Sequence, residues 1–165
     1  TIEQGKEETM LQLNIMAVYK LTRLFLGQML ARNAGSIINI SSATAFQPMP
    51  KMSTYAATKA FVKQLSESIS EELKMQNSSV HIMAVCPAAI ADTKFKSAAS
   101  MDRVKTFDGL AVTTAAEVAK DTWAGFKNKK SLVVTGSRMR LLHFFTQFVP
   151  SGLTQFFVRK EMEES

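Results

Sequence analysis

Tyr55 and Lys59 are the side chains of this sequence whose types and spacing best suit acid–base chemistry. They lie four residues apart in the run Ser-Thr-Tyr-Ala-Ala-Thr-Lys, so on a helix both would project from the same face. A free tyrosine has a pKa of about 10, and a neighbouring ammonium group lowers that pKa because it favours the phenolate. The pair therefore predicts a phenol that exchanges a proton with a substrate oxygen, as an acid or as a base.

Two further polar residues belong to the same candidate site. Ser42 precedes Tyr55 by thirteen residues and stands at the carboxyl end of a predicted strand, where parallel-sheet proteins place their reactive groups. Asn14 lies on the helix predicted before that strand. Each of these residues has an ordinary structural explanation when taken alone, so the combination is what indicates a site.

Four short segments, in their order and spacing, resemble the short-chain dehydrogenase/reductase family. The resemblance covers about residues 9–136 and is carried by Leu13-Asn14-Ile15, residues 35–42, Tyr55-x-x-x-Lys59 and Val85-Cys86-Pro87. It implies an NAD(P)-dependent oxidoreductase that transfers a hydride between a nicotinamide and a carbonyl or alcohol substrate. The catalytic residues that it implies are Asn14, Ser42, Tyr55 and Lys59.

The resemblance also implies a role for each of these residues. Tyr55 would give its proton to the carbonyl oxygen, which Ser42 would hold, and Lys59 would hydrogen-bond the nicotinamide ribose. Asn14 would orient a water molecule that passes protons toward Lys59. A loop after the second strand would bind the nicotinamide amide, with Ala88 where family members usually have glycine and Asp92 at the usual threonine position. The cofactor-binding residues implied in this way are Tyr55, Lys59, Pro87, Ile90 and Thr93.

Hydrophobic periodicity predicts the elements that position these residues. Helices are expected over residues 9–32, 53–75 and 114–128; Ser53 or Thr54 would cap the second, and Thr114 with Glu117 forms a capping-box pattern at the third. Strands are expected over residues 36–42, buried on both faces, and over 80–86 and 131–135. Such alternation predicts an α/β fold, a Rossmann-like doubly wound parallel sheet.

The glycine-rich turn that cradles the pyrophosphate in this family has no counterpart in the sequence, where no G-x-x-x-G-x-G run occurs. We therefore expect the chain to lack the N-terminal nucleotide-binding half of the domain, including the residue that would choose between NAD and NADP. Residues 1–136 would be the C-terminal catalytic half, and residues 137–165 an amphipathic tail of the same domain. The strand over residues 36–42 should then expose an unpaired edge or an apolar face, and this chain alone should be inactive.

Composition indicates which classes of binding partner suit this chain. The 20 basic residues give a net charge of +6 but are scattered and do not alternate with aromatic residues, which argues against nucleic acid binding. The lone Cys86 and two histidines offer neither an internal disulfide nor a metal site, and a cytoplasmic location is expected. Phenylalanines with basic flanks in residues 138–160 are compatible with membrane-surface contact, with docking onto the missing half or with a subunit interface.

The first two helices resemble the usual subunit interface of the family, so a homodimer or homotetramer is expected. The interface residues expected on these helices are Leu11, Val18, Phe25, Val62, Leu65 and Ile69. The substrate is expected to be a small carbonyl or alcohol molecule, and the Phe and Met content suggests that it is apolar. Residues 94–110 show no firm hydrophobic period and could form a lid.

Two other functions remain open. The chain could be a non-catalytic oligomerisation or interaction module derived from the same fold. A hydrolase using Ser42, a histidine and Asp92 is a weaker alternative, because no G-x-S-x-G sequence surrounds any serine.

Overall fold

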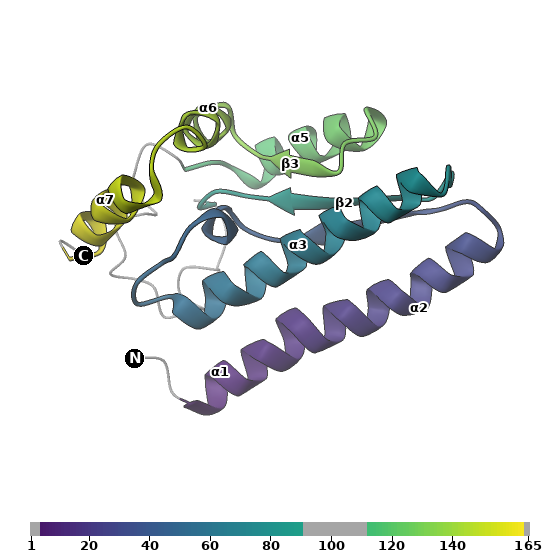
Figure 1. Cartoon of the computed structure of the whole chain (residues 1–165), viewed down its shortest axis with the longest axis horizontal. Helices are drawn as coiled ribbons and strands as arrows, with labels where there is room; N and C mark the ends of the chain where they lie inside the picture. The colour runs from purple at the N-terminus through teal and green to yellow at the C-terminus, as the bar shows by residue number, and fades with distance from the viewer. Residues whose placement is uncertain (1–3, 91–111, 164–165) are drawn as a thin grey trace.

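Three parallel strands form the centre of the molecule in the order β1-β2-β3, and helices cover both faces of this sheet (Figure 1). The structure, a computed structural model, describes residues 4–90 and 112–163. The elements, in chain order, are α1 (Gln4–Leu11), the π-helix η1 (Gln12–Ala17), α2 (Val18–Ala31), β1 (Ser36–Ile40), the 3-10 helix η2 (Ala43–Phe46), α3 (Ser53–Met75), β2 (His81–Cys86), α5 (Ala115–Lys127), β3 (Leu132–Val134), α6 (Ser137–Thr146) and α7 (Ser151–Glu163). This alternation of helices and parallel strands confirms the predicted α/β, Rossmann-like class.

The core is built on β2, whose six residues are all buried. Ile82 packs into a cluster with Leu26 of α2 and Ile69 of α3. Met83 points to the opposite face and packs with Val133 and Phe126, the latter on α5. Since side chains alternate along a strand, β2 is covered on both faces, and its residues from Ile82 to Cys86 are all apolar.

The first predicted helix is longer than expected and contains a π-helical segment that periodicity did not predict. It begins at Gln4, and the wider π turns run from Gln12 to Ala17. Leu11 and Phe25, two of the expected interface residues, are 40% and 46% exposed, whereas Leu26 is buried. A π turn holds more residues than an α turn, so it rotates the residues after it relative to those before it. The regular period of an α-helix therefore does not predict which residues of this helix face the core.

Helix α3 begins without the side-chain cap expected from Ser53 or Thr54. Met52 occupies the cap position, and the Thr54 hydroxyl instead donates to Glu7 Oε1 at 2.8 Å, which ties α3 to α1. Val62 and Ile69, which were expected at a subunit interface, are instead buried inside the chain. These two residues therefore cannot form part of a surface between subunits.

Strand β1 is not buried on both faces as predicted. It ends at Ile40 and pairs with β2 alone in the part of the chain that the structure describes. Ile38 and Ile40 are 40% and 52% exposed. The separate expectation that this strand exposes an edge or an apolar face is therefore confirmed.

The C-terminal third follows the prediction closely. Thr114 and Glu117 form the capping box at the start of α5, with the Thr114 hydroxyl accepting from Glu117 N at 3.2 Å. Two short helices, α6 and α7, form the tail on either side of Pro150. The expected lid, residues 94–110, lies outside the described residues. No helix in the ranges 4–90 and 112–163 is long and apolar enough to span a bilayer.

Candidate active site

Tyr55 and Lys59 lie together near the start of α3, beside the carboxyl end of β1. The Lys59 Nζ is 5.7 Å from the centroid of the Tyr55 ring. The same Nζ donates a hydrogen bond to the Ile40 carbonyl at 3.1 Å. The ammonium group thus lies between the tyrosine ring and the last residue of the strand. The spacing predicted that the two side chains share a helix face, but it did not predict the contact with Ile40.

Ser42 completes this arrangement from the loop that follows β1. Its Oγ accepts a hydrogen bond from the Thr44 backbone N–H at 3.2 Å and caps η2. The Ser42 side chain is also hydrogen-bonded to Tyr55. The structure therefore brings three of the four predicted catalytic residues into one cluster at the carboxyl edge of the sheet.

Burial shifts the pKa values of both Tyr55 and Lys59. It raises the pKa of Tyr55, and the hydrogen bond with Ser42 offsets this only in part. It lowers the pKa of Lys59, while Cys86 acts weakly in the opposite direction. Both shifts follow from the cost of placing a charge away from water. The expectation that Lys59 lowers the pKa of Tyr55 is therefore wrong for the chain by itself, where burial has the larger effect.

Asn14 lies in the π-helical segment and contacts α3 rather than Lys59. Its Nδ2 donates to Thr58 Oγ1 at 3.1 Å, and the Thr58 hydroxyl donates to the Tyr55 carbonyl at 2.7 Å. Thr58 has no exposed surface. Asn14 thus fixes the backbone of Tyr55 through a buried hydroxyl. Such π-helical segments occur frequently at functional sites.

Ser41 is a residue of this site that the sequence reasoning missed. It is buried, and its Oγ donates to the Lys59 carbonyl at 2.7 Å, while its backbone N–H donates to the Val85 carbonyl at 2.7 Å. It fixes the backbone of Lys59 from the side of the strand. The adjacent pair Ser41-Ser42 was a usable signal, because neighbouring residues of an extended segment project to opposite sides.

The loop after β2 reaches the same edge of the sheet. Pro87 is buried, and its carbonyl accepts from the Ala43 backbone N–H at 2.8 Å, next to Ser42. Ile90 forms an isolated parallel bridge with Thr113 further along the loop. Thr93, the remaining predicted cofactor-binding residue, lies outside the described residues.

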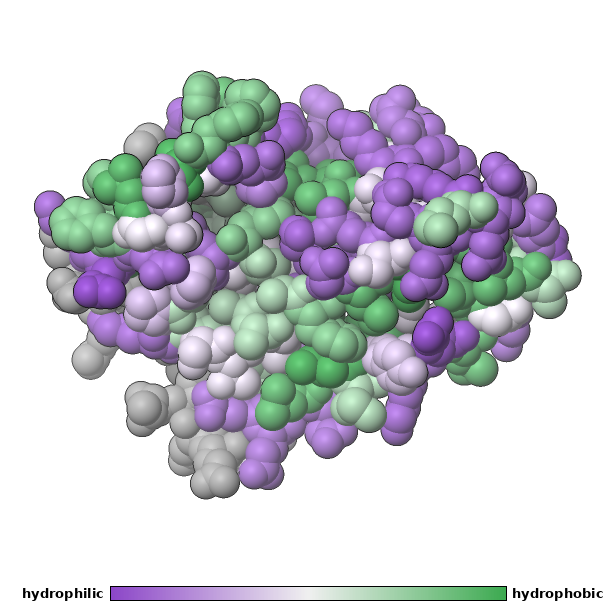
Figure 2. Space-filling model, viewed as in Figure 1, coloured by the Kyte–Doolittle hydropathy of each residue, from purple (hydrophilic) through white to green (hydrophobic). Residues whose placement is uncertain are grey.

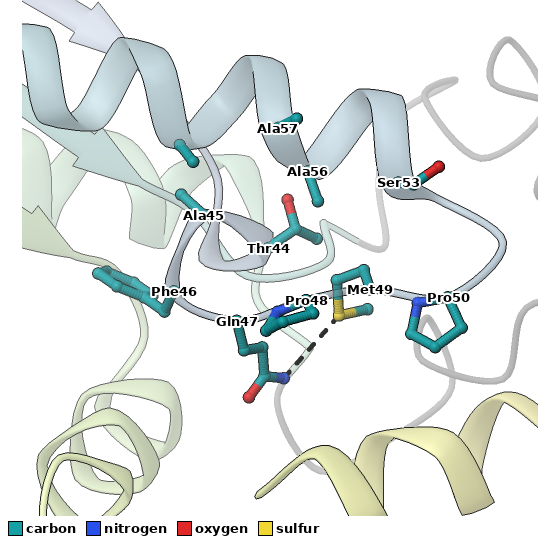
Figure 3. A pocket seen from close by; sticks show the side chains of 11 residues that line it. Thr44, Ala45, Phe46, Gln47, Pro48, Met49, Pro50, Ser53, Ala56 and Ala57 are labelled. Carbon is teal, nitrogen blue, oxygen red and sulfur yellow. Dashed lines mark hydrogen bonds between the residues drawn. The ribbon is translucent and has the colours of Figure 1, made fainter. Parts of the chain in front are cut away.

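A cavity of about 640 Å³ lies between residues 44–50 and α3 (Figure 3). The α3 residues that line it include Ser53, Ala57 and Ala60, which recur at the spacing of one helix face. Tyr55 and Lys59 fall on a different face of the same helix, so this cavity is a neighbour of the site rather than the site itself.

The remaining chemistry-bearing side chains have structural partners. His81 Nε2 lies 3.0 Å from the Lys130 carbonyl, and the His143 ring stacks on Phe46 with 3.9 Å between centroids. Ser42 is engaged by Thr44 and Tyr55, which is not the environment of a serine–histidine pair. Within residues 4–90 and 112–163, no group of three or more His, Cys, Asp or Glu side chains is placed to hold a metal ion.

Comparisons with known proteins agree with this geometry. A family model described as short chain dehydrogenase matches residues 1–103. The mouse very-long-chain 3-oxoacyl-CoA reductase is 39% identical over 82 residues, which are 50% of this chain and 26% of that protein. Human 17-beta-hydroxysteroid dehydrogenase type 3 is 36% identical over 88 residues, 53% of this chain and 28% of that protein. The chain thus spans about a quarter of the length of these curated relatives.

Solved structures extend the likeness beyond the matched segment. A short-chain dehydrogenase from Sphingobium yanoikuyae in complex with NADPH has a TM-score of 0.70 and 27% identity, covering 93% of this chain and 57% of that one. A short-chain dehydrogenase/reductase from Burkholderia phymatum in complex with NAD has a TM-score of 0.62 and 25% identity, covering 82% and 56%. With the family match over more than half its length and the Ser42–Tyr55–Lys59 cluster in place, this chain belongs to the short-chain dehydrogenase family.

Proposed function

We propose that the whole protein is an NAD(P)-dependent oxidoreductase that transfers a hydride between a nicotinamide and a carbonyl or alcohol, with Tyr55 as the acid or base. The observation that carries the proposal is the Tyr55 side chain hydrogen-bonded to Ser42 and lying beside the Lys59 ammonium. A carbonyl that accepts a hydride at carbon becomes an alkoxide at oxygen, and this oxygen needs a proton and a hydrogen-bond donor. Tyr55 and Ser42 supply these two groups.

The residues of the site suit the nicotinamide end of a dinucleotide. The bound cofactor would supply the hydride. Lys59 carries three donors on its ammonium group, and its contact with Ile40 uses one of them. We propose that Lys59 turns another donor toward the ribose. The similar bacterial proteins bound to NADPH and NAD support the choice of cofactor class.

We propose that the substrate is a bulky apolar carbonyl or alcohol. Tyr55 packs against a cluster of Met49, Met52, Ala56 and Val158, so the surroundings of the phenol are largely hydrocarbon. Two of the similar proteins are named as a very-long-chain 3-oxoacyl-CoA reductase and a 17-beta-hydroxysteroid dehydrogenase, and both names denote substrates with a large apolar part, an acyl chain or a steroid.

The test uses the two tyrosines of the chain. In the whole protein, Tyr55→Phe should lower turnover of an apolar ketone by about a hundredfold or more, because it removes the general acid. Tyr19→Phe is the matched control, since Tyr19 is 39% exposed on α2, and it should leave turnover unchanged. The measurement is the oxidation of NADPH or NADH followed by absorbance. Near-normal turnover of Tyr55→Phe would refute the assignment.

A non-catalytic interaction module is the second candidate, and the surface of α2 favours it. Leu24 of α2 is 57% exposed and Leu13 of the preceding η1 is 61% exposed. Such exposed apolar side chains commonly mark a contact surface. The same surface supports the expected homodimer or homotetramer. A wild-type protein that assembles through α2 but transfers no hydride from either nicotinamide would favour this candidate over the enzyme.

A further inference from the structure

The two tail helices turn their apolar faces outward. On α6 and the turn after it, Leu141, Phe144, Phe145 and Phe148 recur at the spacing of one helix face and are between 55% and 73% exposed. On α7, Leu153, Phe156 and Phe157 form a second such face, with exposures between 49% and 61%. Figure 2 shows hydrophobic side chains gathered over α6 at the upper left of the molecule. We call these seven residues the aromatic surface.

The opposite faces of the same helices are anchored to the rest of the chain. His143 of α6 stacks on Phe46 of η2, with the ring centroids 3.9 Å apart. Val158 of α7 is buried in the cluster of Met49, Met52 and Ala56 against which Tyr55 packs. A helix that packs through its less apolar face and exposes its aromatic one reverses the usual arrangement for a surface helix.

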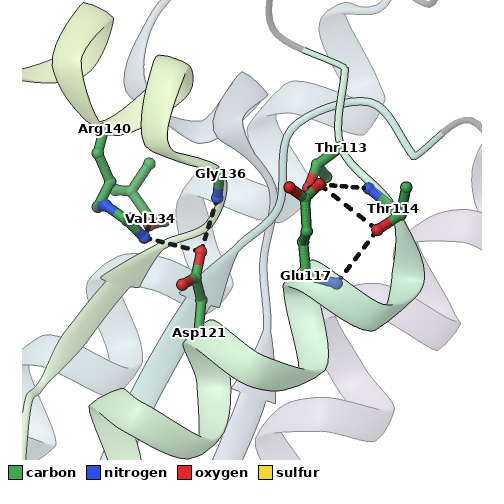
Figure 4. A network of polar contacts seen from close by, with 7 residues as sticks. All are labelled: Thr113, Thr114, Glu117, Asp121, Val134, Gly136 and Arg140. Carbon is green, nitrogen blue, oxygen red and sulfur yellow. Dashed lines mark hydrogen bonds and ion pairs between the residues drawn. The ribbon is translucent and has the colours of Figure 1, made fainter.

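Polar contacts also fix the start of α6. Asp121 Oδ2 of α5 accepts from the Gly136 backbone N–H at 2.8 Å and from Arg140 Nη1 at 2.7 Å (Figure 4). These bonds hold the first turn of α6 against α5 and β3. The outward direction of its phenylalanines is therefore set by specific contacts on its other side.

Charge distinguishes this surface from an ordinary protein contact. Residues 137–160 carry four Arg and Lys residues and no Asp or Glu, and acidic residues follow only from Glu161 onward. Arg138 continues the aromatic face of α6 one turn before Leu141, and Lys160 continues that of α7 one turn after Phe156. Arg138 thus precedes the aromatic residues of α6 and Lys160 follows those of α7, and both basic side chains are exposed.

We propose that the aromatic surface docks on a lipid bilayer that contains anionic headgroups. Phenylalanines on the exposed face of a helix enter the boundary between headgroups and acyl chains, and Arg or Lys at the ends of that face reach back to the phosphates. The inference is independent of catalysis by Tyr55. Failure of the Tyr55 test would leave it standing, and failure of the vesicle test below would leave the Tyr55 assignment standing.

The test is sedimentation of the chain with vesicles of phosphatidylcholine alone and of phosphatidylcholine with phosphatidylserine. The wild-type chain should bind the anionic vesicles more tightly. Phe144→Gln with Phe157→Gln should weaken binding to both compositions by about tenfold or more, because two large apolar groups no longer leave water. Arg138→Gln with Lys160→Gln should weaken binding to the anionic vesicles selectively.

A matched control uses two apolar side chains elsewhere on the surface. Leu24 and Trp123 are 57% and 59% exposed, close to the 55% and 61% of Phe144 and Phe157. Leu24→Gln with Trp123→Gln should therefore leave vesicle binding unchanged. Absence of wild-type binding, or equal loss in the control, would overturn the proposal. So would a Phe144→Gln, Phe157→Gln variant that separates an oligomer by light scattering while it still binds vesicles, because the aromatic surface would then be a contact between copies.

Discussion

At the scale of single residues, the site depends on hydroxyl groups that position backbone rather than on charges that meet directly. Two hydrogen-bonded contacts reach the backbone of α3. Asn14 donates to the Thr58 hydroxyl, which donates to the Tyr55 carbonyl, and the Ser41 hydroxyl donates to the Lys59 carbonyl. Tyr55 and Lys59 therefore keep their relation to β1 before any cofactor arrives. This preorganisation is what an acid–base pair needs, since small displacements of a proton donor slow the transfer.

Cys86 gives a prediction about pH at the same scale. Burial raises the pKa of its thiol from 9.0 to about 11. The folded chain favours the neutral thiol, so this contribution to stability is complete below pH 9 and is lost as the pH rises toward 11. A shift of this size corresponds to roughly 3 kcal/mol at most.

Cys86→Ala should therefore make the free energy of unfolding fall less steeply over that interval, as measured by urea denaturation at a series of pH values. Tyr55, whose pKa is also raised by burial, contributes equally to both proteins and does not disturb the comparison. Parallel curves for the two proteins would show that folding does not raise the pKa of the Cys86 thiol.

At the scale of elements, one glycine determines how closely a helix can approach the sheet. A Cβ added to Gly125 of α5 would lie 2.2 Å from Val133 Cγ2 of β3, closer than real atoms approach. Gly125→Ala should therefore destabilise the chain by about 1–3 kcal/mol, the usual cost of overpacking.

Gly27 of α2 is the matched control, because a Cβ added there meets nothing within 4 Å. Gly27→Ala should stabilise the chain by about 0.5–1 kcal/mol, since alanine loses less backbone entropy in a helix. Thermal unfolding of both variants measures the difference. Equal shifts in the same direction would contradict the packing of α5 on β3.

Local patterns allowed the order of the elements and most of the site to be predicted, because short-range signals decide them. The spacing of Tyr55 and Lys59 and the capping box at Thr114 depend on a few adjacent residues. Other features depend instead on contacts between distant segments. They are the π-helical segment around Asn14, the exposure of Ile38 and the start of α3 at Met52 without a side-chain cap. Such tertiary effects override local preference and leave no periodic signal.

At the scale of the whole molecule, the sheet is open along β1. Ile38 and Ile40 are exposed on a strand that has one partner among the described residues, and the sequence contains no glycine-rich run for a pyrophosphate. Residues 1–165 by themselves should show no saturable binding of NADH or NADPH by calorimetry, because the pyrophosphate site supplies much of the affinity for the cofactor. Micromolar binding would mean that other residues of this chain form that site.

The position of Val158 has a kinetic consequence if α7 meets lipid. One side of this helix carries Phe156 and Phe157, and the other places Val158 in the cluster that contacts Tyr55. A hydrophobic substrate could then reach the phenol by lateral diffusion without entering the aqueous phase. The rate of turnover would then depend on the mole fraction of substrate in the bilayer. Added lipid would dilute the substrate and lower the rate, whereas added water would not.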